Sequence, residues 1–381
     1  MRIAINTRFL IAGHLEGYGN FTAETMRRIT QQHPEHEFYF LFDRPFDKQF
    51  AFSNNITPIV IGPPARHAVL FKWWYDVRVP ATLRKIKADV FVSTDGFCSL
   101  VTKLPQVLVV HDLAFLHHPG FIKKSHLLFY KRYTPKFIAI AKQVATVSQF
   151  SKQDILAHYK TDPGKISVIG SAAREIFQPV SWQEKEAIKE QYTDGKEYFL
   201  FSGAIHPRKN LVNLLKAFSL FKKRQLSNMQ LVLCGRMAWQ TTEFEEKLAT
   251  YKYRSDVKLL GFVPEPDLAK LTASAYAVVY PSLFEGFGLP ILEAMQCGVP
   301  VITSNTSSMP EVGRDAALYA DPTNPEDIAT QMKLIYKDEN LRAELIVKGE
   351  EQVQKYSWQK TADALWELIE KAKESSPDSN K

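Results

Sequence analysis

In the second half of the chain, short apolar runs of strand length alternate regularly with longer segments of helical character. The predicted strands cover residues 198–202, 230–234, 257–262 and 276–280, and the predicted helices cover about 211–223, 243–251 and 266–273. A strand that is followed by a helix and then by another strand is the repeating unit of a parallel sheet. The alternation therefore predicts an α/β domain built on a doubly wound parallel sheet.

The first half begins with a predicted strand at residues 2–6, and further strand candidates follow at 37–42, 57–61, 89–93, 107–110 and 144–148. With 381 residues, the chain is long enough for two domains of ordinary size, each with its own core. Its hydrophobic content of 45% is that of a globular protein and excludes a largely disordered chain. We expect the boundary between the two domains near 175–195, in the polar segment 181–192.

A glycine-punctuated loop joins the strand 276–280 to a short helix that Pro290 opens. Proline suits the first helical position because its φ is already helical and its missing N–H is not needed there. The amides of Phe287, Gly288 and Leu289 should then point out of the helix N-terminus, which favours a bound anion. The alternative is an ordinary buried junction between a strand and a helix.

Two glutamates bracket this element, with Glu285 in the loop and Glu293 about one turn inside the helix. The spacing allows both carboxylates to face the same cleft. Two acids beside a phosphate-binding helix end suit a ligand that carries both hydroxyls and phosphates. The alternative is that both are solvated side chains.

A basic pair follows the strand 198–202, where Gly203 leads into Arg208 and Lys209. The guanidinium fork of arginine and the point charge of lysine, placed just past a strand end, can neutralise a diphosphate. The alternative is a solvated basic turn, which is where such pairs are more commonly found.

Two further candidates lie in the first half. His111 and Asp112 follow the strand 107–110, at the edge where open α/β sheets place ligands, although a lone histidine is more often structural. Gly17 and Gly19 lie in a loop between a strand and a helix, an arrangement that can approach a phosphate. Because only a G-x-G pattern is present, a dinucleotide fingerprint is weakly supported.

The segment SLFEGFGLPILEAMQCGVPVITS, residues 282–304, resembles the E-x7-E segment of retaining nucleotide-sugar glycosyltransferases of family 4. Other pieces of the chain follow in that family's order. The resemblance implies the GT-B fold, in which two Rossmann-like, doubly wound domains face each other across a cleft. It predicts an acceptor-side domain at 1–180, a nucleotide-sugar domain at 181–356, a helix at 357–374 that packs back on the first domain, and a disordered tail at 375–381.

The resemblance also assigns roles to the candidate residues. Glu285 and His111 would lie beside the transferred sugar as the catalytic residues, and Glu293 would bond the ribose hydroxyls. The remaining donor-binding residues would be Gly203, Arg208, Lys209, Phe287, Gly288 and Leu289, and Gly17 and Gly19 would line the phosphate and acceptor loop. The chain departs from the family in the loop LEGYGN, residues 15–20, where the usual glycine pair and arginine are replaced, and in the link 166–179, which lacks the usual proline–asparagine pair.

The implied activity is transfer of a hexose from a nucleotide-diphospho-sugar to a glycan or lipid-linked acceptor, with retention, in cell-surface polysaccharide synthesis. No D-x-D pair occurs, so we expect neither a metal nor another cofactor. The alternatives are a nucleotide-sugar epimerase or phosphorylase, an NAD-dependent oxidoreductase, and a non-catalytic protein that binds sugar nucleotides.

Positive charge is concentrated in the first half, where residues 1–180 contain 23 Lys and Arg against 13 Asp and Glu. No nucleic-acid-binding pattern accompanies this charge, so anionic lipid head groups or a phosphorylated acceptor fit better as partners, and the alternative is a domain that is merely soluble and basic. The segments 66–78 and 122–136 are both basic and aromatic. In the first of them, Leu70, Trp73, Trp74 and Val77 share a helical spacing that suits either a membrane surface or the domain core.

The three cysteines, Cys98, Cys234 and Cys297, are far apart in apolar contexts and lack metal-ligand spacing, which indicates core thiols in a reducing compartment. The N-terminus enters a strand directly, and no apolar run approaches 18 residues, so we expect neither a signal peptide nor a spanning helix. The predicted location is the cytoplasm, with peripheral attachment to the inner face of the plasma membrane as a further hypothesis.

Overall fold

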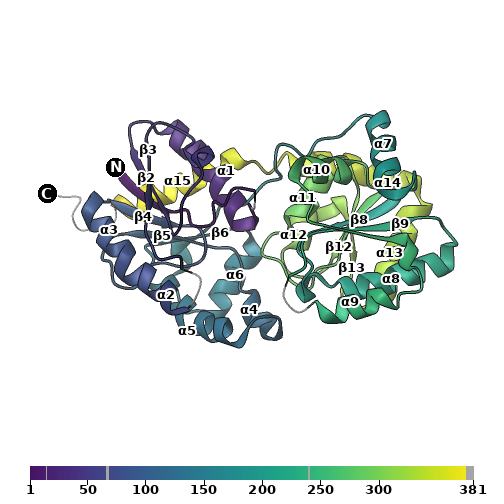
Figure 1. The fold of residues 1–381 in the computed structure, drawn as a ribbon, viewed down its shortest axis with the longest axis horizontal. Helices are drawn as coiled ribbons and strands as arrows, with labels where there is room; N and C mark the ends of the chain where they lie inside the picture. The colour runs from purple at the N-terminus through teal and green to yellow at the C-terminus, as the bar shows by residue number, and fades with distance from the viewer. Residues whose placement is uncertain (14, 66–67, 239–240, 375–381) are drawn as a thin grey trace. The chain divides into compact units, whose positions relative to one another are not determined.

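The computed structural model describes residues 1–13, 15–65, 68–238 and 241–374 (Figure 1). The chain divides into two compact units, one formed by residues 1–171 together with the chain from 358 onward, and the other by residues 172–357. Each unit contains one parallel sheet with helices packed against it. The predicted tail at 375–381 lies outside the described residues.

The first unit contains a seven-stranded sheet in the order β3-β2-β1-β4-β5-β6-β7. Its strands are β1 (Arg2–Asn6), β2 (Glu37–Phe42), β3 (Ile56–Val60), β4 (Val90–Ser93), β5 (Gln106–Val110), β6 (Gln143–Thr146) and β7 (Ile166–Val168). Its helices are α1 (Gly17–Gln32), α2 (Ala68–Trp73), α3 (Val79–Ile86), α4 (Ala114–His117), α5 (Lys124–Ile140), α6 (Gln149–His158) and α15 (Trp358–Glu374). Every residue of β4 and β5 is buried, as expected for central strands of a parallel sheet covered on both faces.

The last helix, α15, belongs to this first unit and lies beside α1 and over β4, β5 and β6. It is amphipathic, and its apolar side chains Trp358, Ala362, Leu365, Trp366 and Ile369 are buried. The indole of Trp366 stacks on the ring of His33, with ring centroids 3.7 Å apart. Near its end, Lys373 pairs with Asp89 at 2.9 Å.

The second unit contains a six-stranded sheet in the order β10-β9-β8-β11-β12-β13. Its strands are β8 (Tyr198–Ser202), β9 (Gln230–Cys234), β10 (Val257–Gly261), β11 (Ala277–Tyr280), β12 (Val301–Ser304) and β13 (Ala317–Ala320). Its helices are α7 (Trp182–Thr193), α8 (Leu211–Gln225), α9 (Thr242–Ala249), α10 (Glu265–Ala273), α11 (Leu289–Gln296), α12 (Met309–Gly313), α13 (Pro325–Lys337) and α14 (Glu339–Val353).

Both sheets reverse their direction of growth once, which confirms the predicted doubly wound architecture. In the first unit the reversal lies between β1 and β4, and in the second between β8 and β11. Ligands of open α/β sheets bind at the carboxyl ends of the strands beside such a switch point. The loops after β1, β4, β8 and β11 are therefore where the fold itself places a site.

The structure sets the division between the units at 171 and 172, nine residues before the predicted division at 180 and 181. The intervening segment packs with the second unit because α11 holds it. The side-chain amide of Gln296 donates to the main-chain oxygens of Arg174 and Phe177, at 3.0 and 2.7 Å. Phe177 is itself fully buried. The polar sequence of α7 indicates a helix at the surface, but the chain begins to pack with the second unit before α7 starts.

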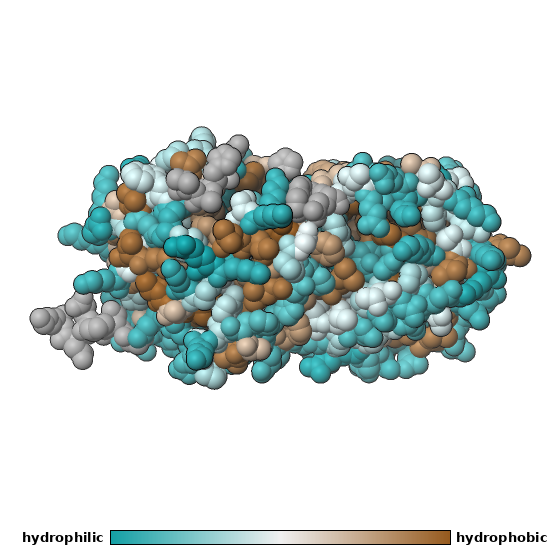
Figure 2. Space-filling model, turned by 90° about the horizontal axis from the view of Figure 1, so that it is seen from below, coloured by the Kyte–Doolittle hydropathy of each residue, from teal (hydrophilic) through white to brown (hydrophobic). Residues whose placement is uncertain are grey.

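The aromatic segment before α3 divides between core and surface. Trp74 is buried and donates its indole N–H to the main-chain oxygen of Ile61 at 2.8 Å, whereas Trp73 and Val77 are 49% and 43% exposed. A π-helical turn, Trp74–Arg78, separates α2 from α3 and changes the helical register, so residues at regular α spacing do not share one face. Figure 2, which views the molecule from the side of α2 and α5, shows apolar surface interrupted by polar surface. Among the helices described, none is both long and apolar enough to cross a membrane.

Candidate functional site

A short 3-10 turn, Pro207–Lys209, follows β8 at the switch point of the second unit. The imidazole of His206 accepts a hydrogen bond from the Arg208 amide at 3.2 Å and caps this turn. The main-chain oxygen of Arg208 accepts from the amide of Leu283 at 2.9 Å, and the Asn210 side chain donates to the main-chain oxygen of Pro281 at 3.0 Å. The loop after β8 is thereby fastened to the loop after β11.

Arg208, Lys209 and Glu285 meet between these two loops, and we refer to these three residues as the cationic cluster. The Nη1 of Arg208 lies 2.9 Å from Oε2 of Glu285, and Nζ of Lys209 lies 2.6 Å from Oε1. Lys209 also donates to the hydroxyl of Tyr280 at 2.5 Å, and Arg208 donates to the main-chain oxygen of Phe284 at 2.6 Å. The structure thus brings Arg208 and Lys209 into contact with Glu285, which lies 77 and 76 positions further along the chain.

The cluster keeps a net positive charge at neutral pH. Burial favours the neutral form of Glu285, but the charges of Arg208 and Lys209 outweigh burial and hold the pKa of this carboxyl at about 2. Burial, followed by the charge of Glu285, raises the pKa of Tyr280 well above its usual range, so its phenol stays protonated. Two cations and one carboxylate leave one positive charge at the switch point, where an anionic ligand is expected.

The loop that contains Glu285 is fixed on both sides of that residue. The hydroxyl of Ser307 accepts from the Glu285 amide at 3.0 Å, and the hydroxyl of Ser308 lies 2.9 Å from the main-chain oxygen of Glu285 and 2.8 Å from that of Phe287. Gly288 has φ +106, a conformation that favours glycine, and it directly precedes α11. Helix α11 begins at Leu289, so Pro290 occupies the second helical position instead of the predicted first one.

Glu293 has a different partner from Glu285. Its Oε1 accepts from Nε of Arg174 at 2.8 Å, and the same guanidinium lies 3.3 Å from Glu265. Glu293 is buried in α11, with 4% of its surface exposed. The sequence suggested that both glutamates could face one cleft; in the structure each forms its own ion pair. Arg174 was not predicted, because its partner is 119 residues away and its local sequence carries no basic pattern.

Three glycines lie side by side where β8, β9 and β10 end. The Gly203 amide donates to the main-chain oxygen of Cys234 at 2.9 Å, and the Gly235 amide donates to that of Gly261 at 2.7 Å. Gly203 and Gly235 have φ values of +144 and +147. A Cβ on Gly203 would lie 3.9 Å from Cε of Lys209, so this glycine borders the cationic cluster. Gly235 directly follows β9.

His111 lies in the first unit, directly after β5. Its Nε2 is 2.9 Å from the main-chain oxygen of Thr94, and since a carbonyl can only accept, Nε2 carries the proton and Nδ1 is the acceptor nitrogen. The ring packs against those of Tyr18 and Phe21, with centroids 4.8 and 4.9 Å away. Burial lowers the pKa of His111, so the ring is neutral at pH 7. Asp112 instead accepts from the amide of Ala114 at 2.9 Å.

The two predicted loop glycines, Gly17 and Gly19, differ in how much space a side chain would have at each position. A Cβ on Gly19 would lie 2.6 Å from the main-chain oxygen of Phe9, whereas one on Gly17 would meet nothing within 4 Å. Beside this loop lies a pair that the sequence did not reveal: buried Arg8 donates to Asp95 at 2.6 Å. Arg8 and Asp95 each lie two residues after a strand, β1 and β4, at the switch point of the first unit. This position in the sequence could have indicated that they meet.

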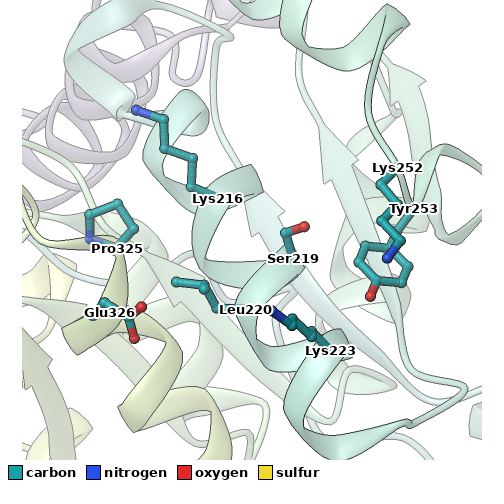
Figure 3. Close-up of a pocket in the computed structure, with 8 residues that line it drawn as sticks. All are labelled: Lys216, Ser219, Leu220, Lys223, Lys252, Tyr253, Pro325 and Glu326. Carbon is teal, nitrogen blue, oxygen red and sulfur yellow. The ribbon is translucent and has the colours of Figure 1, made fainter.

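A pocket of about 460 Å³ lies elsewhere in the second unit (Figure 3). It is lined by Lys216, Ser219, Leu220, Lys223, Lys252, Tyr253, Pro325 and Glu326. None of the predicted site residues lines it. The pocket therefore shares no residue with the cationic cluster.

Two family models together match most of the chain. The model for glycosyl transferases group 1 matches residues 183–352, and the model for glycosyltransferase family 4 matches residues 16–172. The O-antigen chain mannosyltransferase B of Escherichia coli is 32% identical over 254 residues, which cover 66% of this chain and 67% of that protein. The O-antigen chain mannosyltransferase RfbU of Salmonella typhimurium is 32% identical, with 60% of each chain covered.

Other similarities are partial or concern the fold alone. The serotype-specific mannosyltransferase WbdA of Escherichia coli is 31% identical, but the match covers 67% of this chain and only 32% of that protein. A solved sucrose-phosphate synthase from Thermosynechococcus elongatus superposes with a TM-score of 0.80 at 18% identity, covering 98% of this chain and 100% of the other. The solved structure of WaaG, a glycosyltransferase involved in lipopolysaccharide biosynthesis, has a TM-score of 0.75 at 16% identity and covers 96% of this chain and 99% of the other.

Proposed function

Because the chain belongs to the group 1 glycosyltransferases of family 4, we propose that it transfers a hexose from a nucleotide-diphospho-sugar to a glycan or lipid-linked acceptor in cell-surface polysaccharide synthesis. The second unit would bind the donor and the first unit most of the acceptor. The observation that carries this proposal is the cationic cluster at the β8–β11 switch point. Since the named relatives are mannosyltransferases, mannose is the first donor sugar to test.

The chemical task of the cluster is to stabilise the departing nucleoside diphosphate. When the bond between the sugar and the diphosphate breaks, negative charge develops on the terminal phosphate oxygens. Arg208 can meet two of these oxygens with its planar fork, and Lys209 can approach as a point charge. Because Glu285 already holds both cations in place, they need little reorganisation when this charge develops. In this proposal they take the place of a metal ion on the diphosphate.

The catalytic assignments remain those implied by the family. Glu285 lies beside the sugar and positions both cations. Glu293 hydrogen-bonds the ribose hydroxyls after Arg174 has given up part of its ion pair with Glu293. His111, neutral at pH 7, contributes hydrogen bonding to the sugar and no charge. We further propose that the anomeric configuration is retained, with the leaving phosphate accepting the proton of the acceptor hydroxyl on the same face.

A donor panel tests this function directly. The purified chain is heated with UDP-, GDP- and ADP-sugars, including GDP-mannose, and then incubated with each stabilising donor and a lipid-linked acceptor extract. We expect at least one donor to raise the melting temperature and to label the acceptor, at a rate that added Mg²⁺ or Mn²⁺ does not raise. Proton NMR of the anomeric centre reports retention. No stabilisation across the panel, or release of an epimer or sugar phosphate only, would contradict the proposal.

We also propose that the first unit docks on anionic lipid through the surface formed by α2 and α5, the docking surface. On α5, Leu128 is 72% exposed, and Lys131 and Arg132 are exposed beside it. The two helices adjoin, since Nζ of Lys72 lies 5.2 Å from the ring centroid of Tyr133. An apolar side chain surrounded by cations is what a membrane-surface helix presents to lipid head groups.

The charge of the docking surface gives a testable difference in lipid binding. The variant Lys131→Gln/Arg132→Gln should bind phosphatidylglycerol-containing vesicles at least about tenfold more weakly, since each cation near such a surface contributes about 1 kcal/mol. Vesicle co-sedimentation measures this. Leu226→Asn is the matched control, because Leu226 is 89% exposed in the second unit and its left-handed backbone suits asparagine. Equal binding of all three proteins, or equal binding to neutral vesicles, would refute docking through this surface.

A further inference from the structure

Three side chains with metal-binding atoms meet in the first unit, apart from every residue assigned above. His117 is the last residue of α4, and Asp154 and His158 lie one turn apart on α6. The Nε2 of His117 is 2.8 and 3.0 Å from the two carboxylate oxygens of Asp154, and Nδ1 of His158 is 3.1 Å from one of them. One ligand atom of each residue lies within 4.8 Å of the other two.

The spacing and the ligand types match one class of ion. Zinc lies about 2.0–2.2 Å from nitrogen and oxygen ligands, so two ligands of one ion are separated by at most about 4.4 Å. The observed separations therefore need only small side-chain rotations. Two imidazoles and one carboxylate suit Zn²⁺ and its borderline neighbours, whereas Mg²⁺ and Ca²⁺ prefer an all-oxygen shell.

The surroundings of the three residues also suit a bound ion. The Asp154 side chain is 6% exposed, while the side chains of His117 and His158 are 33% and 39% exposed, so an ion can reach the buried carboxylate from solvent. An ion at Nδ1 of His158 would replace the hydrogen bond that this nitrogen donates to the main-chain oxygen of Asp154 at 2.9 Å.

We propose that His117, Asp154 and His158 bind one divalent ion of the zinc class and that this ion fastens α4 to α6. The two helices begin just after β5 and β6, and His111 lies in the short segment between β5 and α4. The hydroxyl of Ser151 on α6 donates to the main-chain oxygen of His111 at 3.0 Å. The ion is structural: it stabilises the backbone beside His111.

The test uses the full chain without an affinity tag, dialysed against a chelator. Calorimetric titration with ZnCl₂ alone should show one ion bound per chain at pH 7.5. At a concentration about 100 times Kd, Zn²⁺ should raise the melting temperature by about 5 °C. Binding should weaken as the pH is lowered, because metal ligands must be deprotonated. Mg²⁺ and Ca²⁺ at the same concentration should give no shift.

The variant His117→Ala/His158→Ala should bind Zn²⁺ at least about 100-fold more weakly, since loss of an outer-shell partner alone costs 10–100-fold. His126→Ala is the matched control, because His126 is an exposed histidine on α5 of the same unit. Asp154→Asn provides a second test if the double variant fails to fold. Absence of saturable binding to the wild-type chain, or equal binding to the wild type and a folded ligand variant, would overturn the proposal.

Discussion

Replacing both cations of the cluster, in Arg208→Ala/Lys209→Ala, is expected to lower kcat/KM for sugar transfer at least about 10³-fold. Removal of one preorganised donor to a developing oxyanion typically costs about 10²–10³-fold, and this variant removes two charged donors. The same variant should lose stabilisation by any nucleoside diphosphate, because a single buried carboxylate then replaces a net positive site. Steady-state kinetics and thermal shift with a donor that stabilises the wild-type chain measure both effects.

Two controls separate electrostatic catalysis from unfolding. The double variant leaves Glu285 buried without its partners, a defect that typically costs about 3–5 kcal/mol. Adding Glu285→Gln should restore most of that stability without restoring transfer. Lys223→Ala/Arg224→Ala also removes one lysine and one arginine, but from exposed positions of α8, and should leave kcat/KM unchanged. If Arg208→Ala/Lys209→Ala retains wild-type turnover, the cluster does not bind the diphosphate.

The sequence was sufficient to predict the sheet architecture because most strands are largely apolar and helical segments alternate with them. The strands predicted at 198–202 and 230–234 coincide with β8 and β9. Their carboxyl ends are the positions at which parallel sheets expose loops, and this placed Arg208 and Lys209 correctly after β8. Glu285 lies within hydrogen-bonding distance of both because β11 is the neighbour of β8 in the sheet.

The sequence did not allow ion pairs between distant segments to be predicted. Arg174 and Glu293 are 119 residues apart, and Arg8 and Asp95 are 87 apart, so no local spacing links either pair. Helical periodicity also failed where the helix itself is irregular. Because of the π-helical turn after α2, Val77 is exposed while Trp74 is buried, although three residues of regular α-helix would have placed both on one apolar face.

Gly235→Ala is expected to destabilise the second unit by about 4 kcal/mol and to abolish donor binding. A Cβ at this position would lie 1.9 Å from the main-chain oxygen of Gly203 and 2.6 Å from its carbonyl carbon. Neither atom belongs to a flexible side chain, so the backbone after β8 must move. That backbone leads directly to Arg208 and Lys209, and the positive φ of Gly235 adds strain of about 1–3 kcal/mol.

The neighbouring glycine separates backbone strain from close approach. Gly261 also has a positive φ, +67, but a Cβ there would meet nothing within 4 Å. Gly261→Ala should therefore cost only about 1 kcal/mol and keep donor binding. Differential scanning calorimetry of both variants, with and without nucleoside diphosphate, measures the contrast. If both variants melt alike, φ strain alone accounts for these glycines. A much lower transition for Gly235→Ala would show that contact between the ends of β8 and β9 shapes the donor site.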